Sequence, residues 1–240
     1  TTAPDYEAKN TYTGTVTASD NSTDPVFGAR QTTQDITVNV LDENDNAPSI
    51  TSAATFSMSE TRAEPLLIGP VTATDVDFNG SVTLEYTVSG SEMTIGLNTG
   101  VLEFVTAPDY ETKNKYTATV TVSDGGNSST QDITVNILDE NDNAPVITSS
   151  SSFSADENQT SIGDVTATDA DFNNSVVLEY SVSGSELTIG LTSGTLSFVT
   201  APDFETKDTY TATVTVTDGG NSTSQNITVN VNDVGGSDDN

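Results

Sequence analysis

The sequence repeats itself, and the length of the repeat limits what the chain can fold into. The stretch "TAPDYETKNKYTATVTVSDGG" begins at Thr106, and a near copy, "TAPDFETKDTYTATVTVTDGG", begins at Thr200. A third copy, "TAPDYEAKNTYTGTVTASD", begins at Thr2. Asp109 and Asp203 occupy the same place in two of the copies and are 94 positions apart (203 − 109). A unit of about 95 residues is longer than a helical or propeller repeat and suits an independent small domain.

We expect one partial unit and two complete units. Residues 1–46 carry only the second half of a unit, residues 47–143 and 144–233 are complete, and residues 234–240 form a tail or linker. The first copy has an insertion around "NSTDPVFGAR", where Pro, Gly and Asp indicate a surface turn. Because its first residues match the middle of a later unit, we expect the chain to be a piece of a longer protein. Whether residues outside it supply the missing half stays open.

Apolar and polar residues alternate within each unit, which predicts β-strands. In "YTATVTVSD", the residues Tyr116, Ala118, Val120 and Val122 alternate with Thr and Ser, and Gly and Pro fall between such runs. In the second unit we expect strands at about residues 50–57, 60–63, 67–74, 82–88, 92–95, 101–105, 115–123 and 130–138. The count is about seven short strands, depending on how the first pair is counted. This number in one unit predicts an all-β fold, an antiparallel sandwich of two sheets.

The composition excludes several classes of function. The chain has no Cys and no His, which removes disulfides, thiolate metal sites and the usual general base. Its 36 acidic and 6 basic residues give a net charge of −30, which disfavours nucleic-acid binding and attracts cations. No apolar run in this segment is long enough to insert into a membrane. The acids recur in copies at strand ends, with no Trp to stack a sugar, so we expect no enzyme.

Carboxylates and amides collect where the predicted strands end, and alternation does not explain them. The second unit places there Glu60, Asp75, Asp77, Asp109, Glu111, Asp124, Asp139, Asn141, Asp142 and Asn143. The third unit repeats most of the acids, as Glu157, Asp169, Asp171, Asp203, Glu205, Asp218 and Asp233. Any one of these residues alone is better explained as an ordinary turn residue.

As a repeated set, these residues predict a hard cation. Strand ends of neighbouring sandwiches meet in a tandem array, so the charges would converge on one junction. Two like charges about 4 Å apart cost about 4 kcal/mol at an effective dielectric of 20. Calcium takes about six to eight oxygen ligands from carboxylates, amides and carbonyls, and it matches this set better than magnesium does.

The stretch "LDENDNAP", at residues 41–48 and again at 138–145, resembles the linker between cadherin repeats. The pairs "DVD" and "DAD", "DYE" and "DFE", and the "DEN" that begins at Asp156, resemble the other calcium motifs of that family. The resemblance covers essentially the whole chain. It implies tandem Greek-key β-sandwiches of the cadherin/immunoglobulin-like kind, with about seven strands each. The Thr-rich units resemble most the cadherin-like repeats of large bacterial surface and secreted proteins.

The resemblance also implies about three calcium ions at each complete junction between repeats. Where the second and third units meet, the first ion would be bound by Glu60, Asp109, Glu111 and Asp142. The second ion would be bound by Glu60, Glu111, Asp139, Asp142, Asp171 and the carbonyl of Glu140. The third ion would be bound by Asn141, Asp169, Asp171, Asp218 and the carbonyls of Asn143 and Asn173. Three divalent ions would reduce the eight carboxylates of this junction from a charge of about −8 to about −2.

The other two acidic groups are less complete. Where the first and second units meet, the corresponding residues are Asp5, Glu7, Asp42, Glu43, Asn44, Asp45, Asn46, Asp75, Asp77, Asn79 and Asp124. That junction has no counterpart of Glu60, because the first unit lacks its first half. At the C-terminal end, the remaining acids are Glu157, Asp203, Glu205 and Asp233. There the "NDNAP" continuation is lost, and calcium binding stays an open question.

We therefore expect an extracellular segment, cell-surface or secreted, whose repeats are made rigid by calcium and which serves cell adhesion or forms the stalk of a surface protein. Two alternatives stay open: a module that binds polysaccharide or another protein, and a structural subunit of an extracellular fibre. The expected partners are calcium and either other cadherin-like repeats or a cell-surface protein or polysaccharide. Exposed aromatic residues on one sheet face would favour the binding module, and ordered contacts between chains would favour the fibre.

Overall fold

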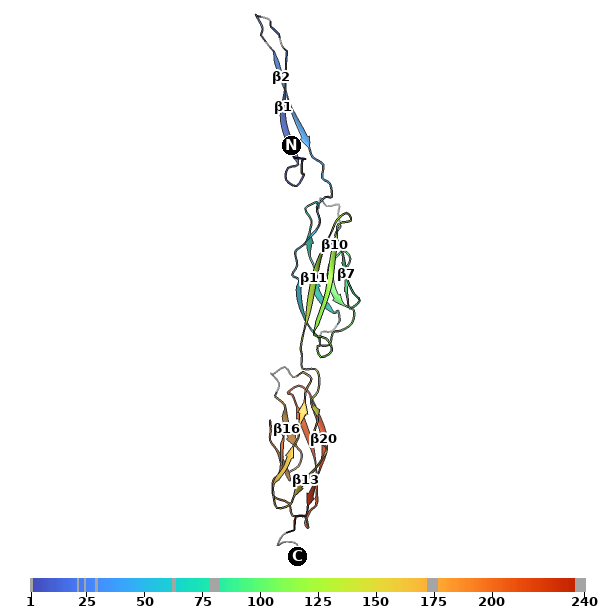
Figure 1. Cartoon of the computed structure of the whole chain (residues 1–240), viewed down its shortest axis with the longest axis vertical. Coiled ribbons are helices and arrows are strands. Elements are labelled where there is room, and N and C mark those ends of the chain that lie inside the picture. Colours follow the sequence, from blue (N-terminus) through green and yellow to red (C-terminus); the bar gives the residue numbers. More distant parts are fainter. Residues whose placement is uncertain are drawn as a thin grey trace. The chain divides into compact units, whose positions relative to one another are not determined.

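The structure is a computed structural model that describes residues 2–20, 22–23, 25–28, 30–61, 64–77, 83–171 and 177–235. In this part of the chain every regular element is a β-strand, which confirms the predicted all-β class (Figure 1). It contains no helix that is long and apolar enough to cross a membrane. The chain divides into two compact units. One is Thr1–Met58, Arg62–Pro108 and Lys115–Asn136, and the other is Ser59–Thr61, Asp109–Asn114 and Ile137–Asn240.

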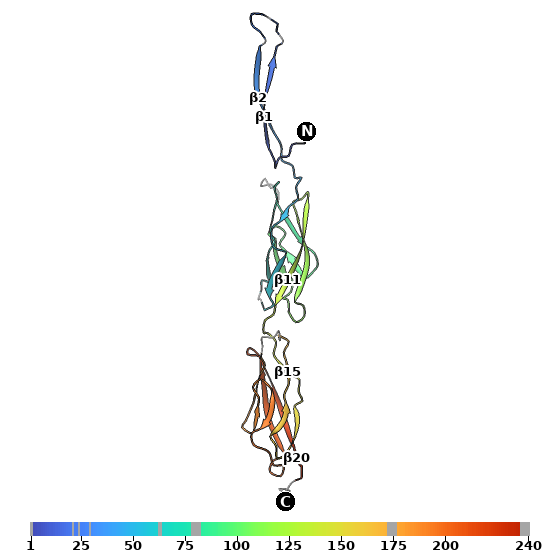
Figure 2. The ribbon, with the colours of Figure 1, turned by 60° about the vertical axis from the view of Figure 1, so that its left-hand side comes forward.

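An isolated hairpin forms the first element, drawn in blue in Figures 1 and 2. Strands β1 (Thr11–Ser19) and β2 (Gln31–Asn39) pair antiparallel, with Tyr12 opposite Val38. Every residue of both strands is exposed. Apolar side chains lie on one face at the places that hold core residues in the later repeats. This face of the hairpin therefore has the composition of a core without being buried.

The second repeat, strands β3 to β11, is a sandwich. Its larger sheet has the order β4 (Thr55–Ser59), β11 (Ser128–Leu138), β10 (Lys115–Ser123) and β7 (Glu85–Val88). Its smaller sheet has the order β5 (Leu67–Pro70), β9 (Val101–Phe104) and β8 (Met93–Ile95). A short pair, β3 (Ser49–Ile50) and β6 (Ala73–Thr74), completes it.

The third repeat, strands β12 to β20, has the same strand order. Its larger sheet is β13 (Ser152–Asp156), β20 (Ser222–Asn232), β19 (Thr209–Thr217) and β16 (Glu179–Val182). Its smaller sheet is β14 (Ser161–Asp164), β18 (Thr195–Phe198) and β17 (Leu187–Ile189), beside the pair β12 (Val146–Ile147) and β15 (Ala167–Thr168). Strands β13 and β20 pair parallel, unlike the antiparallel pairing expected throughout. Figure 2 labels β15 and β20 in this sandwich.

The core of each sandwich follows from the alternation in the sequence. Val120 and Val122 of β10 point inward and are fully buried, whereas Thr121 between them is half-buried on the other face. Val214 and Val216 of β19 repeat this arrangement. Next to the valines of β10, the rings of Phe104 and Tyr116 meet edge to face at 4.8 Å, and an equivalent ring pair lies in the third repeat. Burial of these side chains stabilises the sheets that carry the acidic loops.

Some predicted strands are wrong in extent. The strand expected at residues 67–74 is two strands, because β5 pairs with β9 whereas β6 pairs with β3. The strand expected at residues 50–57 divides for the same reason into β3 and β4. Glu60 and Thr61, expected in a strand, lie in a turn, and residues 62–63 of that prediction lie outside the described part. The turn matters because it places the carboxylate of Glu60 among the acidic loops.

Candidate metal centres

Three groups of carboxylates that share members gather within the second compact unit. They are Glu60–Glu111–Asp139, Glu111–Asp142–Asp171 and Asp169–Asp171–Asp218. In each group, one oxygen of every member lies within 4.8 Å of the others. Glu111 belongs to the first two groups and Asp171 to the last two, so the groups are continuous with one another. Loops at the ends of β4, β15 and β19, the loop before β10 and the linker after β11 supply the members.

In two aspartates of the third repeat, one carboxylate oxygen accepts hydrogen bonds and the other has no hydrogen-bond partner. Asp169 Oδ1 accepts a hydrogen bond from the Asp171 N–H at 3.0 Å. Asp218 Oδ1 accepts from the N–H groups of Gly220 and Asn221, both at 2.6 Å. The second oxygen, Oδ2, of each aspartate is buried and has no hydrogen-bond partner. A buried carboxylate oxygen without a partner is costly, and a cation bound there would remove the cost.

The second repeat shows the same arrangement in the first compact unit. Asp75 Oδ1 accepts from the Asp77 N–H at 2.9 Å, and Asp124 Oδ1 accepts from the N–H groups of Gly126 and Asn127 at 2.7 and 2.6 Å. Asp75 Oδ2 and Asp124 Oδ2 are buried without a partner, as in the third repeat. Two repeats thus leave equivalent oxygens unpaired, which indicates a built feature of the fold.

One aspartate of each repeat binds the linker that precedes it. Asp171, which is 3% exposed, accepts the Asn143 N–H at Oδ2 and the Asn143 side-chain amide at Oδ1, both at 2.7 Å. Asp77 makes the equivalent bonds to Asn46, at 2.7 and 2.8 Å. Burial opposes the charge of Asp77, but the hydrogen bonds from Asn46 hold the pKa of Asp77 below its ordinary value. Asp77 is therefore charged at neutral pH, and hydrogen bonds fix both aspartates in place.

Glu60 performs a similar task at the end of the second repeat. Its side chain is 5% exposed, and its two oxygens accept the N–H groups of Tyr110 and Glu140, the latter at 2.8 Å. Asp109, expected as a ligand of the first ion, is not in any of the groups. Both of its oxygens bind Thr112, through the N–H at 3.1 Å and the hydroxyl at 3.0 Å. Asp109 therefore orders its local turn, and its role as a ligand stays a prediction.

The carboxylates of the second compact unit repel one another. Burial, together with the charges of Glu60 and Asp171, raises the pKa of Asp142 above its ordinary value. Burial and nearby carboxylates raise the pKa of Glu111 in the same way. Burial, followed by the charges of Asp171 and Asp218, raises the pKa of Asp169. Each raised pKa means that the folded protein disfavours the negative charge, and a bound cation would reverse that preference.

The first compact unit holds one further group, Glu7–Asp45–Asp77. Asp5, expected beside it, accepts the Ala8 N–H at 3.0 Å and serves a turn. Of the remaining expected ligands, Asn79 and Asn173 lie outside the described residues. Asp42, Glu43 and the Glu140 side chain do not enter the described groups, and the Glu140 side chain accepts from the Ser59 hydroxyl at 2.9 Å.

The C-terminal acids gather as well. Glu157, Asp203 and Glu205 form a group, and Glu157 is 3% exposed. The two oxygens of Glu157 accept the N–H groups of Phe204 at 2.9 Å and Val234 at 3.1 Å. Val234 stands where Glu140 stands in the second repeat. Glu157 therefore repeats the structural task of Glu60.

Two asparagines near the centres were not predicted from the sequence. Asn221 follows Asp218 in "DGGN", and its side-chain nitrogen reaches oxygens of Asn141 and Asn143. Asn127 in the second repeat reaches Asn44 and Asn46 in the same way. The recurrence of "DGGN" in both complete units was the signal that could have identified them.

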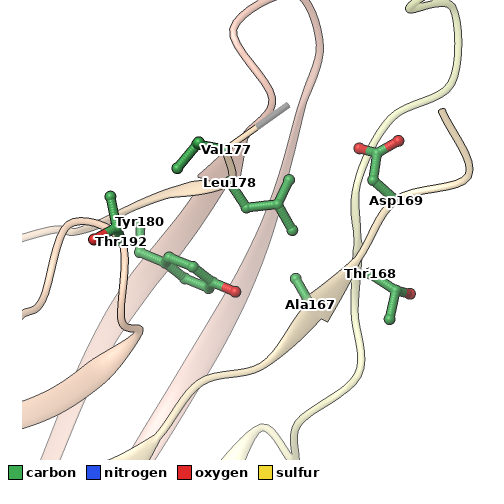
Figure 3. A pocket seen from close by; sticks show the side chains of 7 residues that line it. All are labelled: Ala167, Thr168, Asp169, Val177, Leu178, Tyr180 and Thr192. Atoms are coloured by element: carbon green, nitrogen blue, oxygen red, sulfur yellow. The ribbon is translucent and has the colours of Figure 1, made fainter. Parts of the chain in front are cut away.

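A pocket of about 420 Å³ lies beside Asp169 (Figure 3). Its lining is Ala167, Thr168, Asp169, Val177, Leu178, Tyr180 and Thr192. Figure 3 shows Leu178 and Tyr180 on one side and Asp169 at the margin. Asp169 is the one charged residue among these, and it belongs to the Asp169–Asp171–Asp218 group.

Known proteins resemble this chain over nearly its full length. Residues 151–232 match the family model described as Cadherin domain. The chain is 31% identical over 246 residues to Protocadherin-11 X-linked of Pongo pygmaeus, covering 96% of this chain and 18% of that protein. It is 33% identical over 252 residues to human Cadherin EGF LAG seven-pass G-type receptor 2, covering 96% of this chain and 8% of that protein. The chain thus spans less than a fifth of either relative's length.

Solved structures agree with these relatives. The structure of mouse Cadherin-23 EC22-24 has a TM-score of 0.79 and 26% identity, and the match covers 97% of this chain and 78% of that one. The Protocadherin GammaB4 extracellular domain has a TM-score of 0.77 and 28% identity, over 97% of this chain and 38% of that one. These matches confirm the β-sandwich fold of cadherin ectodomain repeats. Residues 151–232 are thus similar to a cadherin domain, and most of the chain is similar to protocadherins.

Proposed function

We propose that this chain is an extracellular adhesion segment of tandem cadherin repeats, held rigid by calcium at the junctions between repeats. Its homologues are adhesion proteins of the cell surface, and cadherin domains bind calcium at repeat junctions. The observation that carries the proposal is the set of buried carboxylate oxygens without partners, on Asp75, Asp124, Asp169 and Asp218. These oxygens are the ligands that calcium prefers, and they recur at equivalent positions of two repeats.

The residues present fit about three ions at the junction of the second and third repeats. Two groups, Glu60–Glu111–Asp139 and Glu111–Asp142–Asp171, consist of residues expected to bind the second ion, and Asp169–Asp171–Asp218 consists of residues expected to bind the third. The carbonyls of Glu140 and Asn143 would add neutral oxygens. We further propose repeats at residues 1–46, 47–143 and 144–233 with a tail at 234–240, and a less complete centre at Glu7, Asp45 and Asp77.

The mechanism follows from which parts of the chain supply the ligands. Glu60 and Glu111 belong to loops of the second repeat, Asp142 belongs to the linker, and Asp171 belongs to the third repeat. Bound calcium supplies positive charge and coordination to these oxygens. Side chains from two repeats and their linker then face the same charge instead of repelling one another, and motion of the linker is restricted.

Calorimetric titration of the protein after treatment with a chelator tests the proposal. We expect calcium to bind with dissociation constants of about 0.1–1 mM, as in other extracellular modules, and to raise the melting temperature. Glu111→Gln should weaken binding, because Glu111 belongs to two groups. Glu85→Gln, on an exposed position of β7, is the matched control. The absence of binding heat and of any thermal shift at several millimolar calcium, on the order of the weakest such modules, would overturn the proposal.

Homology favours another cadherin repeat as the adhesion partner. A polysaccharide partner and a role as a fibre subunit stay predictions. The narrower resemblance to bacterial surface proteins also stays a prediction, since the organisms named above are all mammals. The homologues are adhesion proteins and not enzymes, and we propose that this chain likewise has no catalytic activity.

A further inference from the structure

The side-chain amide of Asn221 binds three oxygens of the linker. Its nitrogen, Nδ2, lies 2.9 Å from Asn141 Oδ1, 3.0 Å from the Asn143 carbonyl oxygen and 3.3 Å from the Asn141 carbonyl oxygen. Two of these atoms are backbone carbonyl oxygens, which only accept hydrogen bonds. The amide must therefore turn its NH₂ group toward the linker, and its two N–H donors serve three acceptors.

The same contact recurs one repeat earlier. Asn127 Nδ2 lies 2.9 Å from the Asn46 carbonyl oxygen, 3.0 Å from Asn44 Oδ1 and 3.2 Å from the Asn44 carbonyl oxygen. Both asparagines are half-buried and end a "DGGN" turn. Because equivalent acceptors surround two separate side chains, the contact is a regular part of the repeat structure.

The turn that orients the metal ligand also orients this asparagine. Asp218 Oδ1 accepts the Asn221 N–H, and its partnerless Oδ2 belongs to the candidate metal centre. Asp171 holds Asn143 from the other side, through the backbone N–H and the side chain. Asn141 and Asn143 of the linker are therefore bound to the third repeat by hydrogen bonds that need no ion.

The preceding part of the linker is bound differently. The Glu140 N–H donates to Glu60 Oε1 at 2.8 Å, and the Glu60 N–H donates to the Leu138 carbonyl at 3.4 Å. Residues up to Glu140 are thus bound to loops of the second repeat, whereas Asn141 and the backbone of Asn143 are bound to the third. Asn143 Nδ2 also lies 3.2 Å from Glu111 Oε2 of the second repeat, so the change from one repeat to the other begins at the Glu140–Asn141 peptide.

We propose that Asn221 and Asn127 are positioning residues that order the second half of each linker before calcium binds. The proposal rests on the calcium-binding function proposed above. Asn141 Oδ1 and the Asn143 carbonyl are among the oxygens expected to bind the third ion, and an oxygen that accepts one hydrogen bond keeps a lone pair for a cation. With the linker already ordered, calcium binding loses less conformational entropy.

The proposal locates the flexible point of the calcium-free chain. Asn141 and Asn143 should stay on the third repeat, and bending should begin at the Glu140–Asn141 peptide. Without Asn221, Asn141 should become mobile, while Glu60 still binds Glu140 and Asp171 still binds Asn143.

Hydrogen–deuterium exchange of the linker peptide in chelator tests this without any metal. Asn221→Ala should speed exchange at residues 141–143 by about tenfold, the effect of losing one to two net hydrogen bonds. Asn226→Ala is the matched control, because Asn226 lies exposed on β20 and binds only Thr213 among the hydrogen bonds described. Asn127→Ala should change only the earlier linker. Equal linker exchange in wild type and Asn221→Ala would overturn the proposal.

A second variant separates donation from packing. Asn221→Asp keeps the shape but turns an acceptor toward two carbonyls, so linker exchange in chelator should exceed that of Asn221→Ala. If packing alone mattered, Asn221→Asp would behave as wild type, and the proposal would be wrong.

Calcium titration should show about tenfold weaker binding of one ion in Asn221→Ala. If the wild type binds no calcium, the function proposed above fails, while the exchange in chelator still decides the role of Asn221.

Discussion

Replacement of Asp169 by asparagine should stabilise the third repeat without calcium and destabilise it with calcium. Asp169 Oδ1 accepts the Asp171 N–H, and asparagine can keep that acceptor. Asp169 Oδ2 is buried without a partner, and burial and the charges of Asp171 and Asp218 raise the pKa of Asp169. Asparagine removes that charge and puts an NH₂ group beside the oxygens of two carboxylates.

The magnitudes of the two effects are comparable. Without calcium, removal of a buried charge that lacks a partner should stabilise the repeat by about 1 kcal/mol, the lower end for such groups because Asp169 is only half-buried. A change of about 1 kcal/mol shifts the melting temperature of a domain of this size by roughly 4–8 °C. With calcium at about 100 times the dissociation constant, wild type gains about 2.7 kcal/mol from one site, and tenfold weaker binding leaves about 1.4 kcal/mol. The order of the two melting temperatures should therefore reverse.

Scanning calorimetry in chelator and in calcium measures this reversal. Asp218→Asn is the contrasting variant. Burial opposes the charge of Asp218, but the N–H groups of Asn221 and Gly220 hold its pKa below the ordinary value, so its charge stabilises the fold. Asp218→Asn should lower the melting temperature under both conditions. If Asp169→Asn also lowers it in chelator, the repulsion inferred among these carboxylates is wrong.

Three further changes test other parts of the structure. Asp142→Ala should reduce or abolish the change in radius of gyration between calcium and chelator in small-angle scattering, while circular dichroism shows both sandwiches folded; unfolded sandwiches would contradict its place in the linker. Gly194→Ala should lower the melting temperature of the third repeat by about 4 °C or more, equally with and without calcium, because Gly194 has φ +69° and a Cβ there would lie 2.1 Å from the Val165 carbonyl oxygen. Glu7→Gln should weaken calcium binding in the first compact unit and leave calcium binding in the second unit unchanged. Calorimetric titration of Glu7→Gln beside Glu111→Gln measures this difference.

The alternation of apolar residues was enough to predict the sheets, because inward positions such as Val120 and Val135 are decided by burial alone. It was not enough to divide the strands, since β5 and β6 share one apolar run and differ only in their pairing partners. The parallel pairing of β13 with β20 likewise depends on contacts far apart in the sequence.

The acidic positions of the site were visible as repeated motifs, but the task of each residue was not. Asp109 and Asp169 look alike in the sequence, yet Asp109 binds Thr112 with both oxygens and Asp169 leaves one unpaired. Asn221 carries no charge and lies after a glycine turn, so nothing in the residue type indicates that it binds the linker. Hydrogen bonds to a segment about 80 residues away decide its role.

Shared ligands have a consequence for how the chain would sense its surroundings. Because Glu111 and Asp171 each belong to two groups, an ion bound at one group fixes a side chain that the next group also needs. Binding events that orient a common ligand are coupled, and the coupling is reciprocal. The stiffness of the junction would then change over a narrower range of calcium concentration than three independent sites allow, so that the segment acts as a threshold detector of extracellular calcium.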